Sequence, residues 1–166
     1  MSRWVAAAVL AAGCRAQQPG TSASTPAAWE GAHWPPAPGG VAIERGTTLG
    51  TADTAGFALA EVTVGRERLL WLGRRSGERS GAATWTVTDA LVLPPLGADR
   101  QLILALCGSP ASAGGVTIDP EIVAVARAGD AAVLREIEAA WRANRSTGRF
   151  QEVPTAGIAC LNEVES

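Results

Sequence analysis

Carboxylates are the side chains of this sequence whose chemistry could support catalysis. Those available as a pair are Asp89, Asp119, Glu121, Glu152 and Glu163. Two carboxyl groups can act as general acid and general base in a hydrolase, but no motif supports such a pair here. Asp119, which precedes Pro120, is most simply interpreted as a turn former. A carboxylate-dependent hydrolase is therefore the weakest of three functional hypotheses.

Asp89 has two interpretations that the sequence leaves open. Strict alternation along the strand expected at 83–93 places it on the same face as Trp85, Val87 and Leu91. A buried carboxylate there would have a raised pKa or need a partner such as an arginine. Alternatively, a β-bulge or the end of the strand turns Asp89 outward.

Other catalytic and cofactor chemistries have no support in the sequence. His33 is the only histidine and lies in a Pro-rich stretch, so a Ser-His-Asp or Cys-His system would lack a nearby base. Clustered zinc ligands are absent, as are Gly-rich phosphate loops and calcium-loop spacings. We therefore expect a non-catalytic protein with no metal and no cofactor.

Short apolar segments between turn signals predict mainly β-structure. The expected strands cover 57–64, 67–72, 83–93, 101–107, 122–127, 149–153 and 157–161. Alternation in the first of them shifts phase at Ala60-Glu61, which indicates a bulge. We expect an antiparallel sandwich or small barrel of about six or seven strands. The charged stretch from Arg74 to Ser80 is expected to form a loop tip.

One amphipathic helix is expected over residues 131–144, which makes the fold class α+β. Asp130 is a suitable N-cap, and Glu138 and Arg142 form an i,i+4 pair. The residues at helical spacing are Val133, Leu134, Ile137 and Trp141.

The N-terminal segment has the pattern of a secretory signal. Arg3 precedes an apolar run that ends at Ala12 and is too short to span a bilayer as a permanent helix. The following Ala11-Ala12-Gly13-Cys14 resembles the lipobox of bacterial lipoproteins, although the family usually has Leu where Ala11 stands. The resemblance implies removal of residues 1–13 and acylation of Cys14. The alternative is an ordinary secretory peptide cut near Ala12 or Ala16.

Residues 14–40 are expected to form a flexible tether and residues 41–166 a single folded domain. The tether is rich in Pro, Gly, Ser, Thr and Ala, a composition that buries too little apolar surface to become ordered. Trp29 and Trp34 are unusual in a tether. They either pack back on the domain or contact lipid headgroups or a partner.

Charge and composition restrict the classes of partner that this chain is expected to bind. The chain is 47% hydrophobic and 18% charged, with a formal net charge of −2 and arginine as its only strongly basic residue. A mildly acidic chain without basic clusters is a poor candidate for nucleic-acid binding. We expect attachment to the membrane through the N-terminal lipid and an envelope protein as partner. Asp89, with Arg74, Arg75 and Arg79 of the charged stretch, is a candidate contact residue.

Cysteine count predicts one disulfide. If Cys14 carries lipid, Cys107 and Cys160 remain as an even pair in an oxidising compartment, where disulfides persist. The alternative is two buried free thiols. A redox role has no support, because there is no Cys-x-x-Cys pair.

The leading hypothesis is a lipid-anchored envelope protein with a binding or structural role. The second is a secreted-type protein inhibitor of cell-wall hydrolases or a periplasmic ligand binder. Within the lipoprotein family, Arg15 is not the aspartate linked to inner-membrane retention, which implies an outer-membrane location facing the periplasm. The last third, with Asp119-Pro120-Glu121, Ala140-Trp141-Arg142 and 157–163, loosely resembles uncharacterised small bacterial envelope proteins, which implies no activity.

Overall fold

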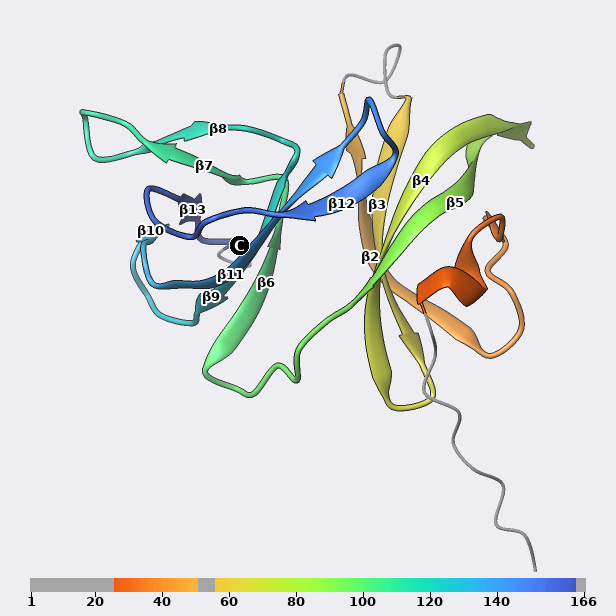
Figure 1. Ribbon diagram of the computed structural model, residues 1–166, viewed down its shortest axis with the longest axis horizontal. Helices are drawn as coiled ribbons and strands as arrows, with labels where there is room; N and C mark the ends of the chain where they lie inside the picture. The colour runs from red at the N-terminus through yellow and green to blue at the C-terminus, as the bar shows by residue number, and fades with distance from the viewer. Residues whose placement is uncertain (1–25, 51–55, 164–166) are drawn as a thin grey trace, which may run out of the picture.

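The computed structural model describes residues 26–50 and 56–163, so the expected signal segment and Cys14 lie outside the described residues. In that part of the chain there are thirteen strands and one short 3-10 turn, η1 (Pro26–Trp29). Every strand pair is antiparallel. The prediction of a mainly antiparallel β-fold is confirmed, and the strands are arranged in three sheets (Figure 1).

Sheet A contains five strands and is built around a meander. In spatial order they are β1 (His33–Trp34), β5 (Ala82–Val92), β4 (Glu67–Arg79), β3 (Phe57–Val64) and β2 (Val41–Leu49). Strands β2 to β5 are neighbours in the order in which they follow one another along the chain. Residues 51–55, between β2 and β3, are not described. The strand expected at 57–64 matches β3.

Sheets B and C are formed by the rest of the chain. Sheet B has the order β12 (Arg149–Glu152), β11 (Ile137–Asn144), β9 (Ile122–Arg127) and β6 (Arg100–Leu104). Sheet C has the order β10 (Val133–Leu134), β13 (Ala159–Leu161), β7 (Cys107–Pro110) and β8 (Val116–Ile118). In the described residues none of these sheets closes into a barrel.

The apolar core is layered between the sheets. Leu59 and Leu72 of sheet A pack against Leu102 and Val125 of sheet B in one cluster. A second cluster lies between sheets B and C, and a third covers the outer face of sheet A around Trp71. Strands β3 and β9 are buried on both faces, so their sequences are nearly continuous in apolar residues rather than alternating.

The predicted helix over 131–144 is wrong. Residues 137–144 form β11, which lies between β9 and β12 in sheet B. Ala140 and Ala143 are buried there, and their small side chains suit a central strand between two packed layers. A register shift between Ile137 and Ala139 interrupts the period of two, which left helical spacing as the more visible pattern.

The charged stretch expected as a loop tip is also wrong, because β4 continues through it to Arg79. Residues 67–79 pair with β5 as a long hairpin that turns at Ser80-Gly81. Gly73 is therefore a strand residue. A Cβ atom at Gly73 would lie 1.9 Å from Cη2 of Trp34, so glycine is needed for the indole to pack against β4.

The bulge expected at Ala60-Glu61 lies on the neighbouring strand instead. Strand β3 pairs with β4 in uninterrupted register, whereas β2 has a register shift between Ile43 and Arg45, opposite Val62 and Glu61. The apparent phase change in β3 arises because both of its faces are buried.

Residues 26–40 fall in the predicted tether but are packed on sheet A. Strand β1 pairs with Trp85 and Thr86 of β5. The rings of Trp29 and Trp34 lie 5.4 and 5.6 Å from that of Trp71. Of the two alternatives for these tryptophans, packing back on the domain is the one observed, and residues 26–40 pack together with the domain that was expected to start at Val41.

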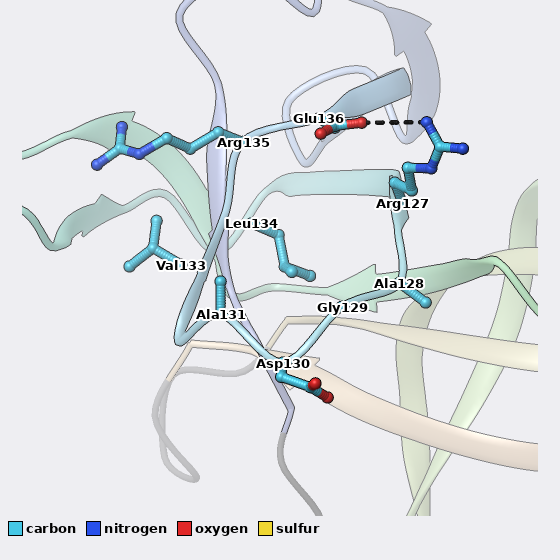
Figure 2. Close-up of a pocket in the computed structure, with 9 residues that line it drawn as sticks. All are labelled: Arg127, Ala128, Gly129, Asp130, Ala131, Val133, Leu134, Arg135 and Glu136. Atoms are coloured by element: carbon cyan, nitrogen blue, oxygen red, sulfur yellow. Dashed lines mark hydrogen bonds and ion pairs between the residues drawn. The ribbon is translucent and has the colours of Figure 1, made fainter.

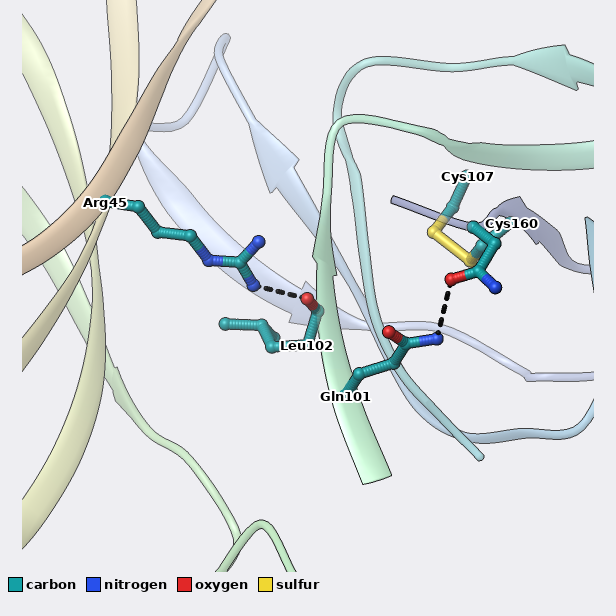
Figure 3. Close-up of a disulfide and its surroundings, with 6 residues drawn as sticks. Arg45, Gln101, Leu102, Cys107 and Cys160 are labelled. Atoms are coloured by element: carbon teal, nitrogen blue, oxygen red, sulfur yellow. Dashed lines mark hydrogen bonds between the residues drawn. A yellow bond between two sulfur atoms is a disulfide. The ribbon is translucent and has the colours of Figure 1, made fainter. Parts of the chain in front are cut away.

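Cys107 and Cys160 form the expected disulfide. They are directly opposite each other on β7 and β13, with Cα atoms 4.0 Å apart, and both are fully buried. Figure 3 shows the bond between the two sulfur atoms. The disulfide thus cross-links two neighbouring strands of sheet C, inside the core that this sheet shares with sheet B.

Candidate functional site

Asp89 is held between sheets A and B. A bulge in β5 leaves Thr88 without a partner opposite β4, so that Leu72 pairs with Asp89 and Gly73 with Val87. This moves Asp89 off the face that carries Trp85 and Val87. Its Oδ2 accepts the N–H of Phe150 at 2.7 Å, and Oδ1 accepts the N–H of Ala90 at 2.9 Å.

The two interpretations of Asp89 therefore each held in part. The bulge is present, yet the side chain is only 17% exposed and lies 3.5 Å from an arginine, Arg149. Both carboxylate oxygens accept backbone hydrogen bonds. Asp89 is thus engaged at an inter-sheet contact instead of facing a cleft.

The candidate arginines lie on the projecting end of the β4–β5 hairpin, which we call the hairpin arm (residues 74–82). All of its residues are exposed, and in Figure 1 it extends away from the other sheets. The Arg74 guanidinium lies over the Phe57 ring, 5.2 Å from its centroid, and Arg75 lies 3.8 Å from Glu78. Arg79 makes no ion pair with the described residues, and the structure does not bring Asp89 into the arm.

Glu61 is the buried charged residue that the sequence did not single out. It is 1% exposed on β3, and its carboxylate binds the Nε of Arg45 at 2.8 Å and a guanidinium nitrogen of Arg68. Its signal in the sequence is a single acidic residue inside an apolar strand, which requires a cationic partner when buried.

Arg45 links three parts of the molecule through one guanidinium. Besides Glu61 it binds the carboxylate of Glu163 and donates to the carbonyl oxygen of Leu102 on β6 (Figure 3). Burial by itself would lower the pKa of Arg45, but the hydrogen bonds and charges of Glu61 and Glu163 outweigh it and raise that pKa. The side chain therefore remains a permanent cation at the contact between sheets A and B.

Asp119 and Glu121 form a second surface cluster with two arginines. Arg142 lies 2.8 Å from Asp119 and 3.2 Å from Glu121, and Arg145 lies 2.6 Å from Glu121. The hydrogen bond to Asp119 is the main reason why the pKa of Arg142 is raised. Asp119 also accepts the N–H of Glu121 at 3.0 Å, as the predicted turn former should.

His33 was expected in the tether, but it lies in β1, on the surface of sheet A. Its Nδ1 lies 2.9 Å from the hydroxyl of Thr86. A hydroxyl and an imidazole are two parts of a nucleophilic triad, but among the described residues no carboxylate binds the ring. No group of three or more potential metal ligands occurs in residues 26–50 and 56–163 either.

Several hollows lie on the surface of the described residues. One of about 260 Å³ lies in the loop after β9 and is bordered by the ion pair of Arg127 and Glu136 at 3.4 Å. Figure 2 shows that pair at the rim, with Arg135 turned in another direction. Asp130, expected as a helix N-cap, is an exposed residue of this loop. No set of polar side chains converges on a common point there.

Comparison with protein-family models, curated proteins and solved structures finds no match for this chain. Among the described residues no helix has the length and apolarity to cross a membrane.

Proposed function

We propose that this chain is a lipid-anchored protein of the bacterial cell envelope whose β-domain has a non-catalytic binding role. The lipobox-like motif at Cys14 supports the anchor, and Arg15 supports an outer-membrane location facing the periplasm. The disulfide is consistent with an oxidising compartment. The expected partner is another envelope protein and not a nucleic acid.

One observation favours binding over hydrolysis: the buried and half-buried carboxylates Asp89, Glu61 and Glu121 are already engaged in contacts within the fold. A general acid or base must reach a substrate proton. Asp89 instead accepts two backbone N–H groups, Glu61 binds two arginines and Glu121 binds two more. These contacts support structural roles for the carboxylates.

The anchor is tested by replacing its thiol. We expect Cys14→Ser to release the protein from a salt-washed membrane fraction and to abolish the added acyl mass. Ala11→Leu is the matched control, because it restores the residue that is usual in the family and should keep the chain in the membranes. A Cys14→Ser chain that stays in the membrane fraction would contradict the proposal.

A hydrolase inhibitor is the second candidate, favoured by the hairpin arm. A projecting hairpin with exposed Arg75 and Arg79 complements the two carboxylates in the cleft of a glycoside hydrolase. We expect the chain to inhibit one of the cell-wall hydrolases extracted from the same cells. Arg75→Ala with Arg79→Ala should relieve inhibition, whereas Arg66→Ala with Arg135→Ala, which removes two exposed arginines elsewhere, should not.

A further inference from the structure

Residues 26–40 lie on the path of the chain between the proposed anchor and the rest of the domain. We call them the cover, because they lie on the face of sheet A that points away from sheets B and C (Figure 1). A chain anchored at Cys14 passes through the cover before it enters β2. A pull between the membrane and the domain therefore acts on the cover before it acts on β2.

The cover is attached to sheet A by few backbone contacts. Strand β1 pairs with β5 at two positions, and two more backbone hydrogen bonds join the residues just before it to Val87. By comparison, β2 pairs with β3 at eight positions. At the other end of the domain, the Cys107–Cys160 bridge holds β13 to β7. A pull on the two ends of the domain therefore meets its weakest backbone attachment at the cover.

The side chains of the cover add apolar packing, but this packing has an unfavourable component. Trp34 is 5% exposed, and its ring lies beside that of Trp71. The indole Nε1 atoms of Trp29 and Trp71 are buried, and within residues 26–50 and 56–163 they have no hydrogen-bond partner. A buried donor without a partner opposes docking, because it can bind water when the cover leaves. The ion pair of Glu30 and Arg149 is exposed, and such pairs contribute little.

The connection between β1 and β2 adds little to this attachment. Residues 35–40 have the sequence Pro-Pro-Ala-Pro-Gly-Gly. Because proline has no backbone N–H, three of these six residues cannot donate a backbone hydrogen bond to the sheet. The carbonyl of Pro38 accepts the N–H of Val41, which is a contact local to the connection. The cover can therefore leave sheet A without disturbing the pairing of β2.

The face beneath the cover favours its return. That face carries buried apolar side chains, among them Leu69, Trp71, Trp85 and Val87. Removal of the cover exposes part of this surface to water, at a cost in free energy that is proportional to the apolar area exposed. We therefore expect the cover to dock again when the pull ends.

We propose that the cover is an extensible part of the tether, which detaches from sheet A under load while the rest of the domain stays folded. At about 3.3–3.6 Å per residue, the eleven residues between Cys14 and the cover span at most about 40 Å, and release of residues 26–40 adds up to about 50 Å. The load arises when the domain binds a partner held farther from the membrane than the docked chain can reach. This inference rests on the proposed lipid anchor, which transmits the load.

The test holds residues 14–166 by their two ends in optical tweezers, with Cys14→Ser to remove the free thiol. We expect a reversible lengthening of up to about 50 Å at a lower force than the unfolding of the sheets. His33→Cys with Thr86→Cys places two thiols at opposite positions of β1 and β5, where a disulfide can lock the cover. The locked chain should lose about half of the lengthening, because only residues 26–32 precede the bridge. His33→Ser with Thr86→Ser is the matched control and should keep all of it.

A second variant tests the packing of the cover. Trp34→Ala should lower the force of the first lengthening, because it removes a ring packed beside Trp71 and Trp85. Trp141→Ala, in sheet B, should leave that force unchanged. Equal effects of the two changes on the first lengthening would show that it does not come from the cover.

A single cooperative unfolding without an earlier lengthening would overturn the inference. An earlier lengthening of the same size in the locked chain would also overturn it. Either result for a chain that is acylated at Cys14 in membranes would refute the extensible tether alone. A chain that lengthens as expected but carries no lipid would instead refute the anchor, and with it the role of the cover as part of a tether.

Discussion

Asp89 and Arg45 both connect sheet A to sheet B, Asp89 as a hydrogen-bond acceptor and Arg45 as a hydrogen-bond donor. Asp89 accepts the outward N–H of Phe150 on one edge of sheet B, and Arg45 donates to the outward carbonyl of Leu102 on the other edge. Each side chain satisfies a backbone group that an edge strand would otherwise leave open. The charged residues at these two positions therefore orient the sheets and protect their edges.

Replacing Asp89 with alanine should destabilise the domain. The change leaves the N–H groups of Phe150 and Ala90 without their acceptor, and hydrogen bonds to charged groups contribute about 1.5–3 kcal/mol each. We expect the free energy of unfolding in urea to fall by at least about 1.5 kcal/mol. Asp130→Ala, which removes an exposed carboxylate, is the control, and an equal effect of both changes would contradict the assigned role.

The sequence allowed us to predict what kind of partner a buried carboxylate needs. It did not allow us to predict which carboxylate is buried most deeply or which arginines bind it. It anticipated that Asp89 would need a bulge or an arginine, and the structure has both. It missed Glu61 because its partners Arg45 and Arg68 come from the two neighbouring strands, and their registers are not visible in the sequence. An acidic residue inside an apolar strand was the available signal.

At the scale of elements, the segment from Pro26 to Gly40 acts as a cover for sheet A. It places Trp29 and Trp34 over Trp71 and shields a face that would otherwise expose large apolar side chains. Its docking depends on Gly73, because any side chain there would occupy the position of the Trp34 ring.

Gly73→Ala should therefore loosen this cover. We expect a loss of about 1–3 kcal/mol, the usual effect of overpacking, and faster proteolysis within residues 26–40. Gly56→Ala is the matched control, because a Cβ there meets nothing within 4 Å. If Gly73→Ala behaves like Gly56→Ala in both measurements, Trp34 does not pack against β4 as described.

Acid should also loosen the cover, through Glu30. Two nitrogens of the Arg149 guanidinium bind its carboxylate, one at 3.2 Å. The hydrogen bond to Arg149 is the main cause that lowers the pKa of Glu30 below its ordinary value of 4.5. A lowered folded-state pKa contributes stability that is complete above pH 4.5 and is lost as the pH falls through the folded-state value.

The indole NMR signal of Trp29, the neighbour of Glu30, reports this loss. We expect it to shift below pH 4.5 in the native chain and to shift less in Glu30→Gln, whose side chain does not titrate. The same acid-induced shift in both chains would show that another group controls the docking.

Strand-level prediction was good for the continuous apolar segments and poor where another pattern competed or the apolar signal was weak. Segments 57–64 and 122–127 were placed with the bounds of β3 and β9. Segment 131–144 was assigned to a helix because Val133, Leu134, Ile137 and Trp141 recur at helical spacing, but residues 137–144 pair with β9 and β12 instead. The segment 41–49, whose apolar residues are separated by the polar run from Glu44 to Thr48, gave too weak an apolar signal to be assigned.

At the scale of the molecule, the Cys107–Cys160 bridge links β7 to β13 within sheet C. The two cysteines are 53 residues apart, and closing a loop of that size stabilises the fold by about 4 kcal/mol in the chain-entropy model. The double variant Cys107→Ala with Cys160→Ala should lose about that much in urea unfolding. Cys14→Ala should leave the unfolding free energy unchanged, and a similar loss in both would mean that the bridge is not the source of stability.

The most direct test of the whole account is the intact mass of the protein purified from membranes, before and after reduction and alkylation. We expect a chain that begins at Cys14 with added acyl mass, in which Cys107 and Cys160 become alkylated only after reduction. An unlipidated chain cut elsewhere would contradict the envelope anchor on which the proposed function rests. Thiols that are alkylated without reduction would contradict the bridge.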